Sequence, residues 1–276
     1  MHFHFRRSYR GPVRLLVADL AGTTVDYGSC APAGAFVELL KRHGVTISDA
    51  EARGPMGMHK RDHIRALLQV PEIARRWQAA QGSAWDEDAV ERLYREFIPL
   101  QTEILPRYNR LVPGTLEAVA RLRERGIRVA ATTGYSREMM EIVLAGAREQ
   151  GFVPDAAFCG SDVAQGRPAP WMALRCAERL GVWPVEAVVH VGDTLVDVEA
   201  GLNGGMWSLG VVRTGNMLGL SRELDEALEE RERQRRLENG RAKMRAAGAH
   251  FVADTLLDAV GHIEEIGLRL AAGEKP

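Results

Sequence analysis

Two acidic segments, each following a short apolar run, contain the side chains of this chain that are best suited to chemistry. Asp19 follows the apolar residues 15–18, and Asp193 and Asp197 follow residues 188–191. Such runs predict buried parallel strands, and open α/β sheets place their ligands at the carboxyl ends of these strands. Hard divalent cations take oxygen ligands. The two segments therefore predict a shared Mg²⁺ site.

Asp19 is also a candidate nucleophile. A carboxylate can attack phosphorus and form an aspartyl-phosphate, which divides one difficult displacement into two easier ones. The alternative for a single strand-end Asp is a turn or a helix cap. The second acidic segment, with Asp193 and Asp197, favours the catalytic interpretation.

Two other segments offer groups that can hold phosphoryl oxygens. Residues 130–135 run from a predicted strand into a Gly turn, where a Thr hydroxyl and backbone N–H groups can bind such oxygens. Arg167 precedes Pro168, which we expect to start a helix. In that position the Arg167 guanidinium could point at a phosphate. An ordinary strand–helix loop and a surface arginine are the alternatives.

Lys60 belongs to a small set, because only four of the 36 basic Lys and Arg residues are lysines: Lys41, Lys60, Lys243 and Lys275. A buried ammonium, or one beside other cations, can lose its proton, whereas a guanidinium does not. Arg61 and two histidines are close in sequence, and His63 lies on the same helical face. A solvated surface lysine is the alternative.

The composition limits the classes of function. The 276-residue chain balances 36 basic against 37 acidic side chains, so we expect neither nucleic acid nor membrane as a partner. The three scattered cysteines favour free thiols. The first residues lack the apolar core of a secretory signal, although a short organellar presequence is an alternative. No apolar run approaches the roughly 20 residues that span a bilayer. We expect a soluble, cytoplasmic protein.

The elements that must position these side chains follow from hydrophobic periodicity. After the first strand, helical spacing marks residues 35–42, 60–69, 72–81 and 87–104. The remainder alternates, with strands at 128–131, 156–159, 188–191, 207–212 and 250–252 and helices at 115–125, 138–149 and 171–179. The charged residues 221–248 predict one or two solvated helices with ion pairs, and a nucleic-acid role for them lacks a net basic patch.

Alternating strands and helices predict the α/β class, with a doubly wound parallel sheet. The helical block that interrupts the alternation predicts an inserted α-helical cap domain over the strand ends. We therefore expect a core domain made of residues 1–27 and 108–276, and a cap domain made of residues 28–107.

The motifs together resemble the phosphonoacetaldehyde hydrolases, a family of the haloacid dehalogenase superfamily. The shared segments are Asp19–Thr23, Pro55–Lys60, Thr132–Tyr135, Gly166–Pro168 and Gly192–Asp197. The chain departs from the family at Leu20, where a Trp is usual, and at Ser29, where Cys is frequent and Cys30 is displaced by one position. How these two departures affect substrate preference stays open.

The resemblance implies a haloacid dehalogenase-like core, a homodimer, and hydrolysis of the P–C bond of phosphonoacetaldehyde through an imine on Lys60 and an aspartyl-phosphate on Asp19. It also implies an Mg²⁺ cofactor and a small-molecule phosphonate substrate. The implied metal ligands are Asp19, the Ala21 carbonyl and Asp193, and the implied phosphoryl-binding residues are Thr133, Gly134 and Arg167. The implied supporting residues are Asp197, Thr194, Met56, His63 and Tyr135.

Ala21 stands where most phosphatases of this superfamily have a general acid. An alkoxide leaving group wants such an acid, so Ala21 argues against the closest alternative, a phosphomonoesterase or mutase of the same fold. An inactive binding protein that kept the fold is an alternative from another class. The joint presence of Asp19, Lys60, Arg167 and Asp193 argues against it.

Overall fold

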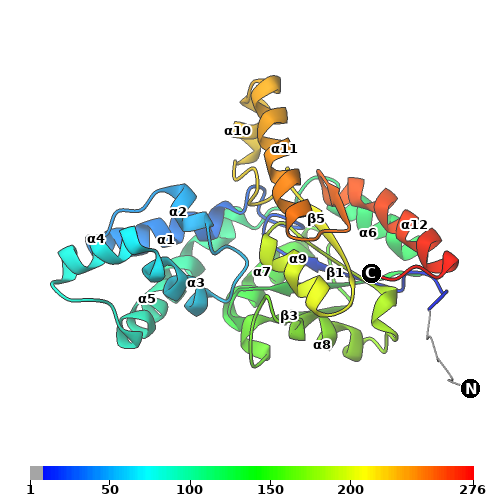
Figure 1. Ribbon diagram of the computed structural model, residues 1–276, viewed down its shortest axis with the longest axis horizontal. Coiled ribbons are helices and arrows are strands. Elements are labelled where there is room, and N and C mark those ends of the chain that lie inside the picture. The colour runs from blue at the N-terminus through cyan, green and yellow to red at the C-terminus, as the bar shows by residue number, and fades with distance from the viewer. Residues whose placement is uncertain (1–8) are drawn as a thin grey trace, which may run out of the picture.

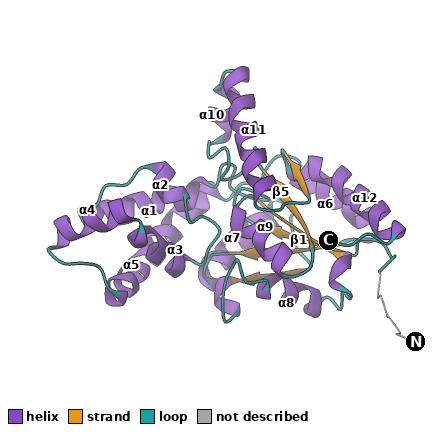
Figure 2. Cartoon of the chain, in the orientation of Figure 1, coloured by secondary structure: helices purple, strands orange, loops and turns teal. Residues whose placement is uncertain are grey.

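The computed structural model describes residues 9–276 and contains one six-stranded sheet with helices on both faces (Figures 1 and 2). All strand pairs are parallel, and the strand order is β3-β2-β1-β4-β5-β6. The strands are β1 (Leu15–Asp19), β2 (Arg128–Thr133), β3 (Ala156–Cys159), β4 (Val188–Gly192), β5 (Trp207–Val211) and β6 (Phe251–Ala253). The predicted α/β class and doubly wound parallel sheet are confirmed.

The central strand β1 shows why these residues form the sheet. Every residue of β1 is buried, as are those of its neighbour β4, because a parallel sheet is covered on both faces. Leu16 packs in the cluster with α6 (Thr115–Glu124), α7 (Arg137–Glu149) and α12 (Leu256–Ala272), whereas Leu15 packs with α8 (Trp171–Arg179) on the opposite face. The carboxyl ends of β1, β2 and β4 consequently lie side by side.

A group of five helices is inserted between β1 and α6 and lies to one side of the sheet (Figure 1). They are α1 (Cys30–Arg42), α2 (Asp49–Arg53), α3 (Lys60–Gln69), α4 (Pro71–Gln81) and α5 (Glu87–Tyr108). Phe36, Leu39, Trp77 and Phe97 are among their buried apolar side chains. We keep the name cap for residues 28–107, and its boundaries stay a prediction.

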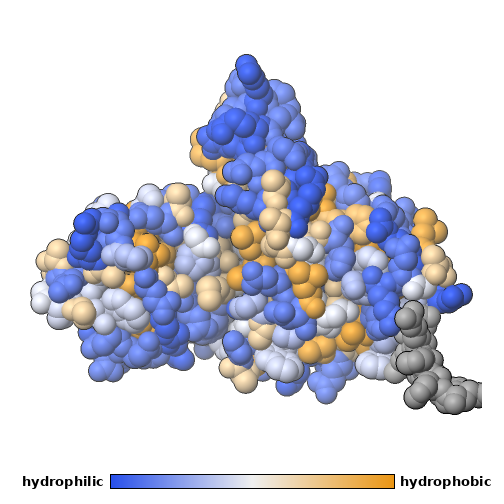
Figure 3. Space-filling model, in the orientation of Figure 1, coloured by the Kyte–Doolittle hydropathy of each residue, from blue (hydrophilic) through white to orange (hydrophobic). Residues whose placement is uncertain are grey.

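The charged segment forms two helices that project from the body, α10 (Arg222–Ala227) and α11 (Glu230–Ala246), and Figure 3 shows a largely hydrophilic surface there. The prediction of one or two solvated helices is confirmed. Asp225 anchors the projection, because its buried carboxylate accepts from the Tyr27 hydroxyl at 2.6 Å and from Nε of Arg213 at 2.8 Å. Arg233 pairs with the other carboxylate oxygen at 3.1 Å.

Several predicted element ends are wrong for identifiable reasons. Helix α5 continues to Tyr108 although Pro99 and Pro106 lie inside it, because its buried face packs against α1 and α7; tertiary packing here overrides the local penalty of proline. Pro168 does not start a helix, since α8 begins at Trp171. The helix predicted at 35–42 begins at Cys30.

Three helices were absent from the sequence-based assignment: α2, α9 (Leu195–Asn203) and α12. Helix α2 has only five residues, too few for a periodic pattern, and is marked by the capping box of Ser48 and Glu51. Helix α12 carries the same signature at Thr255 and Asp258. None of the helices formed by residues 9–276 combines the length and the apolar character that crossing a membrane requires.

Replacing Phe36 tests the apolar interior of the cap. Its ring stacks on His63 and Phe97 with centroids 3.7 and 4.4 Å apart. Phe36→Ala should lower the free energy of unfolding by about 3–5 kcal/mol, because it removes buried apolar area and leaves a cavity. Leu268→Ala, at a side chain that is 74% exposed, should change it by less than about 0.5 kcal/mol. Urea denaturation followed by circular dichroism measures both, and equal effects would contradict the assignment.

Candidate active site

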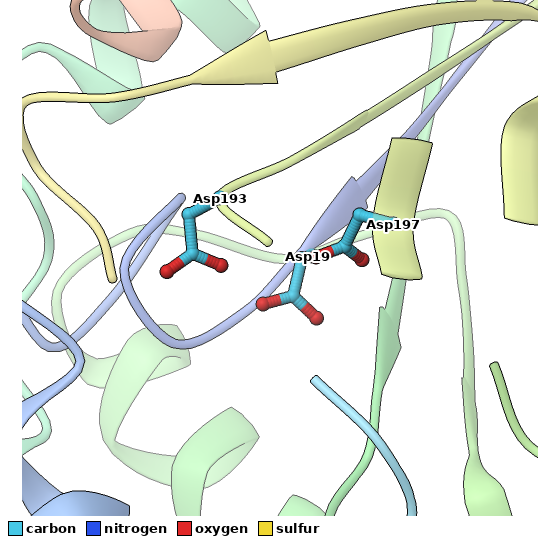
Figure 4. A group of neighbouring side chains, drawn as sticks. All are labelled: Asp19, Asp193 and Asp197. Carbon is cyan, nitrogen blue, oxygen red and sulfur yellow. The ribbon is translucent and has the colours of Figure 1, made fainter. Parts of the chain in front are cut away.

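Three buried aspartates meet at the carboxyl ends of β1 and β4 (Figure 4). Asp19 ends β1, Asp193 directly follows β4, and Asp197 lies in the first turn of α9 (Leu195–Asn203). One oxygen of each carboxylate lies within 4.8 Å of the others. The structure thus brings together the two acidic segments that the sequence separates by more than half of its length.

Local hydrogen bonds hold two of these carboxylates in place. Thr194 caps α9, and Oδ2 of Asp197 accepts from the Thr194 hydroxyl at 2.5 Å and from its N–H at 3.1 Å. This reciprocal capping box fixes the start of α9. Oδ2 of Asp193 accepts from the backbone N–H of Asn216 at 2.7 Å. Asp197 is therefore oriented by its own helix, and Asp193 by a distant loop.

Arg167 supplies a positive charge next to the three aspartates, which we call the aspartate triad, and it is itself buried. Its Nη2 lies 2.6 Å from Oδ1 of Asp19, and its Nη1 lies 2.9 Å from Oδ1 of Asp197. The Thr132 hydroxyl accepts from Nη2 at 2.7 Å. These contacts fix Arg167 beside Asp19, and its single guanidinium pairs directly with two of the three carboxylates.

The charges of the triad suit a bound divalent cation. Burial raises the pKa of Asp19, Asp193 and Asp197, and mutual repulsion raises those of Asp19 and Asp193 further, while Arg167 opposes these shifts. Asp193 has no guanidinium within ion-pair distance among residues 9–276. A hard cation would supply the missing positive charge, and carboxylates accept it as ligands. Ala21 lines the same cavity, and the three carboxylates could hold a divalent metal ion.

Lys60 opens helix α3 and brings a second cation to the site from the cap. Its side chain is buried, and its Nζ lies 5.0 Å from the ring centroid of Tyr135 and 5.7 Å from that of Phe36. Burial and the nearby Arg167 lower the pKa of Lys60 to about 8, although Asp19 opposes the shift. A substantial fraction of the amine is therefore neutral near pH 8, as nucleophilic chemistry requires.

His63 and Tyr135 surround Lys60 as neutral groups. Nε2 of His63 lies 2.9 Å from the Ala52 carbonyl oxygen, which requires the proton on Nε2. Burial and Lys60 lower the pKa of His63 well below its usual value, and burial lowers that of His59. Burial likewise raises the pKa of the Tyr135 hydroxyl. The surroundings of both histidines therefore favour the neutral form.

The candidate site is a small cavity between cap and sheet. It holds about 20 Å³, roughly the space that one water needs. Ten predicted site residues line it: Asp19, Ala21, Met56, Lys60, Thr133, Gly134, Tyr135, Arg167, Asp193 and Thr194. Asp197 and His63 stand just behind, against Arg167 and against the Phe36 ring. A substrate larger than water can enter only if the cap moves away from the sheet.

Some lining residues were not predicted as part of the site. Ser29, Pro32 and Gly57 line the cavity. Ser29 has φ near 49° in the linker to α1, and its departure from the family pattern was the only signal that pointed to it. Asn216 lies in no motif, so no pattern in the sequence marks its contact with Asp193.

Comparisons with known proteins agree with this geometry. The family model described as haloacid dehalogenase-like hydrolase matches residues 13–205. A phosphonoacetaldehyde hydrolase from Syntrophobacter fumaroxidans is 43% identical over 270 residues, which cover 98% of this chain and 98% of that protein. The crystal structure of a phosphonoacetaldehyde hydrolase-like protein from Oleispira antarctica superposes with a TM-score of 0.97 at 42% identity and covers all of both chains.

A fused relative extends the comparison. A bifunctional phosphonoacetaldehyde hydrolase/aminoethylphosphonate transaminase from Clostridioides difficile is 42% identical over 253 residues, which cover 92% of this chain and 40% of that protein. This chain therefore matches less than half of the fused protein.

The close approach of cap and sheet at Gly134 can be tested directly. A Cβ at Gly134 would overlap the Met58 carbonyl oxygen and lie 2.9 Å from that of Gly57. Gly134→Ala should therefore push the cap segment outward and raise amide hydrogen exchange at residues 57–60 at least tenfold. Gly261→Ala, where nothing lies within 4 Å of the new Cβ, is the matched control. Unchanged exchange in Gly134→Ala would show that the cap does not rest on this glycine.

Proposed function

The chain belongs to the phosphonoacetaldehyde hydrolase family of haloacid dehalogenase-like hydrolases, and on this premise we propose that it hydrolyses the P–C bond of phosphonoacetaldehyde to acetaldehyde and phosphate. The observation that carries the proposal is a buried lysine with a lowered pKa in the same cavity as a strand-end aspartate. An amine can activate the aldehyde, and a carboxylate can accept the phosphoryl group.

The first half of the reaction belongs to Lys60. Its neutral Nζ attacks the aldehyde carbon, water leaves, and a protonated imine forms. This cation accepts electrons from the carbon that is bonded to phosphorus, so it makes a carbon leaving group possible. The apolar rings of Phe36 and Tyr135 keep the amine out of water, which favours its neutral form.

The second half belongs to Asp19. Its carboxylate attacks phosphorus while the P–C bonding electrons move into the iminium and give an enamine. Protonation and hydrolysis of the enamine release acetaldehyde and regenerate Lys60, and hydrolysis of the aspartyl-phosphate releases phosphate and regenerates Asp19. The cleavage of the P–C bond itself involves no oxygen leaving group that needs a proton. The presence of Ala21 at the usual position of the general acid is therefore consistent with it.

The other site residues would bind and orient the phosphonate. Thr133 and Gly134 lie at the carboxyl end of β2 and line the cavity, and Arg167 lies within ion-pair distance of Asp19. Mg²⁺ held by Asp19, the Ala21 carbonyl and Asp193 would offset negative charge on the transferring phosphoryl group. The supporting residues would shape the cavity and hold its groups in place: Asp197, Thr194, Met56, His63 and Tyr135.

The wider setting follows from the relatives. The fused relative joins the hydrolase to an aminoethylphosphonate transaminase, which supports a source of the aldehyde in 2-aminoethylphosphonate degradation. We further propose a cytoplasmic homodimer. A phosphomonoesterase remains the competing function, and release of phosphate from phosphonoacetaldehyde but not from p-nitrophenyl phosphate distinguishes the two.

The imine at Lys60 is the decisive test. Lys60→Arg keeps the positive charge but cannot form the adduct, so it should lower phosphate release from phosphonoacetaldehyde at least a thousandfold. Lys41→Arg is the matched control and should keep wild-type activity. Borohydride added with substrate should inactivate the wild type, and peptide mass spectrometry should find the reduced adduct on Lys60. Normal turnover by Lys60→Arg without a trapped adduct would contradict the proposed function and favour a phosphomonoesterase.

Metal removal tests the acidic triad. EDTA should abolish turnover and Mg²⁺ should restore it, because one guanidinium does not neutralise three buried carboxylates beside an anionic substrate. Asp193→Asn should raise the Mg²⁺ concentration for half-maximal activity at least tenfold. Full activity in metal-free buffer would rule out Asp19 and Asp193 as metal ligands.

A further inference from the structure

Arg53 reaches from the cap to several parts of the molecule at once. It ends helix α2, and its side chain is only 11% exposed. Its Nη1 donates to the Gly28 carbonyl oxygen at 2.8 Å and to that of Ser29 at 3.2 Å, and its Nε pairs with Asp49 at 2.6 Å. The guanidinium therefore holds the linker that leads from the sheet into the cap.

The same guanidinium contacts the core through Asn216. Nη1 of Arg53 donates to the Asn216 side-chain carbonyl at 3.3 Å, and the Asn216 side-chain NH₂ donates back to the Arg53 backbone carbonyl at 3.3 Å. The backbone N–H of Asn216 donates to Asp193 at 2.7 Å. One residue thus separates the cap arginine from a carboxylate of the triad.

The linker itself is fixed from the other side. The Gly28 N–H donates to the Thr214 carbonyl oxygen at 2.7 Å, two residues before Asn216. Asp26 accepts from the N–H groups of Cys30 and Ala31 at 3.1 and 3.0 Å. Ser29, which lines the cavity, is therefore held between the Arg53 guanidinium and the segment 214–216.

We propose that Arg53 and Asn216 are positioning residues that act as one latch: their reciprocal contact forms when the cap lies against the sheet, and it sets the orientation of Asp193 and of the Ser29 linker. Arg53 belongs to the cap and Asn216 to the core, so any separation of the two breaks both hydrogen bonds. Neither side chain lines the cavity. The expected effect of the latch on turnover rests on the proposed function, whereas its expected effect on structure does not.

A double-mutant cycle tests whether the two residues act as a unit. Arg53→Ala and Asn216→Ala should each lower kcat/KM for phosphonoacetaldehyde at least tenfold. The kcat/KM of the double variant should be at most about threefold lower than that of the less active single variant, because the first change already breaks the latch. Multiplication of the two factors, to a hundredfold or more, would overturn the proposal.

Two further readouts separate positioning from general stability. Each single variant should raise the Mg²⁺ concentration for half-maximal activity at least fivefold, because segment 214–216, whose backbone N–H at position 216 donates to Asp193, loses its attachment to the cap. Amide hydrogen exchange in segments 26–31 and 214–217 should rise in both single variants, measured without any ligand. Unchanged exchange in either variant would overturn the latch even in an active enzyme.

The control is another cap arginine. Arg76 pairs with Glu51 at 3.1 Å and donates to the Thr46 carbonyl at 2.9 Å, both within the cap. Arg76→Ala should leave kcat/KM and exchange in segments 26–31 and 214–217 at wild-type values, and a loss equal to that of Arg53→Ala would overturn the proposal. If the wild type releases no phosphate from phosphonoacetaldehyde, the proposed function fails, while hydrogen exchange still decides the latch.

Discussion

The neutralisation of three carboxylates buried at the ends of two strands governs the arrangement of the site. Removing a carboxylate from water is unfavourable unless it gains opposite charge and hydrogen bonds. Arg167 pairs with Asp19 and Asp197, Thr194 caps Asp197, and Asn216 donates to Asp193. Each partner comes from a different segment, so the triad requires the sheet, helix α9 and the loop after β5 to be assembled together.

The cap adds the group that the core lacks. The residues of the sheet edge offer carboxylates, hydroxyls, N–H groups and a permanently charged guanidinium, but no amine. Lys60 enters this environment from α3, and Gly134 permits the cap backbone at Gly57 and Met58 to approach. In the proposed mechanism, electrophilic activation by Lys60 and phosphoryl transfer to Asp19 are thereby divided between the cap and the core.

Much of this could be predicted from the sequence, because the strand-end motifs are local. Asp19 and Asp193 each follow a buried apolar run, and a parallel sheet places the ends of such runs at one edge. Lys60 was marked by its rarity and its motif. Arg53 and Asn216 were not found, since their contact joins segments 163 residues apart and follows no periodic pattern. The continuation of α5 past Pro106 was missed because burial against α1 and α7 outweighs a local rule.

Burial of Lys60 also ties its reactivity to the position of the cap. Burial is the largest cause of the pKa shift from the usual 10.5 to about 8, so an amine exposed by an open cap returns toward the higher value. At neutral pH the exposed amine is then almost fully protonated and is a poor nucleophile toward aldehydes in general. The buried amine therefore has a larger neutral fraction than an amine exposed by an open cap would have. In the proposed mechanism, the same contact of cap and sheet that buries the cavity would therefore also generate the nucleophile, and it would restrict imine formation to an aldehyde that fits beside Asp19 and Arg167.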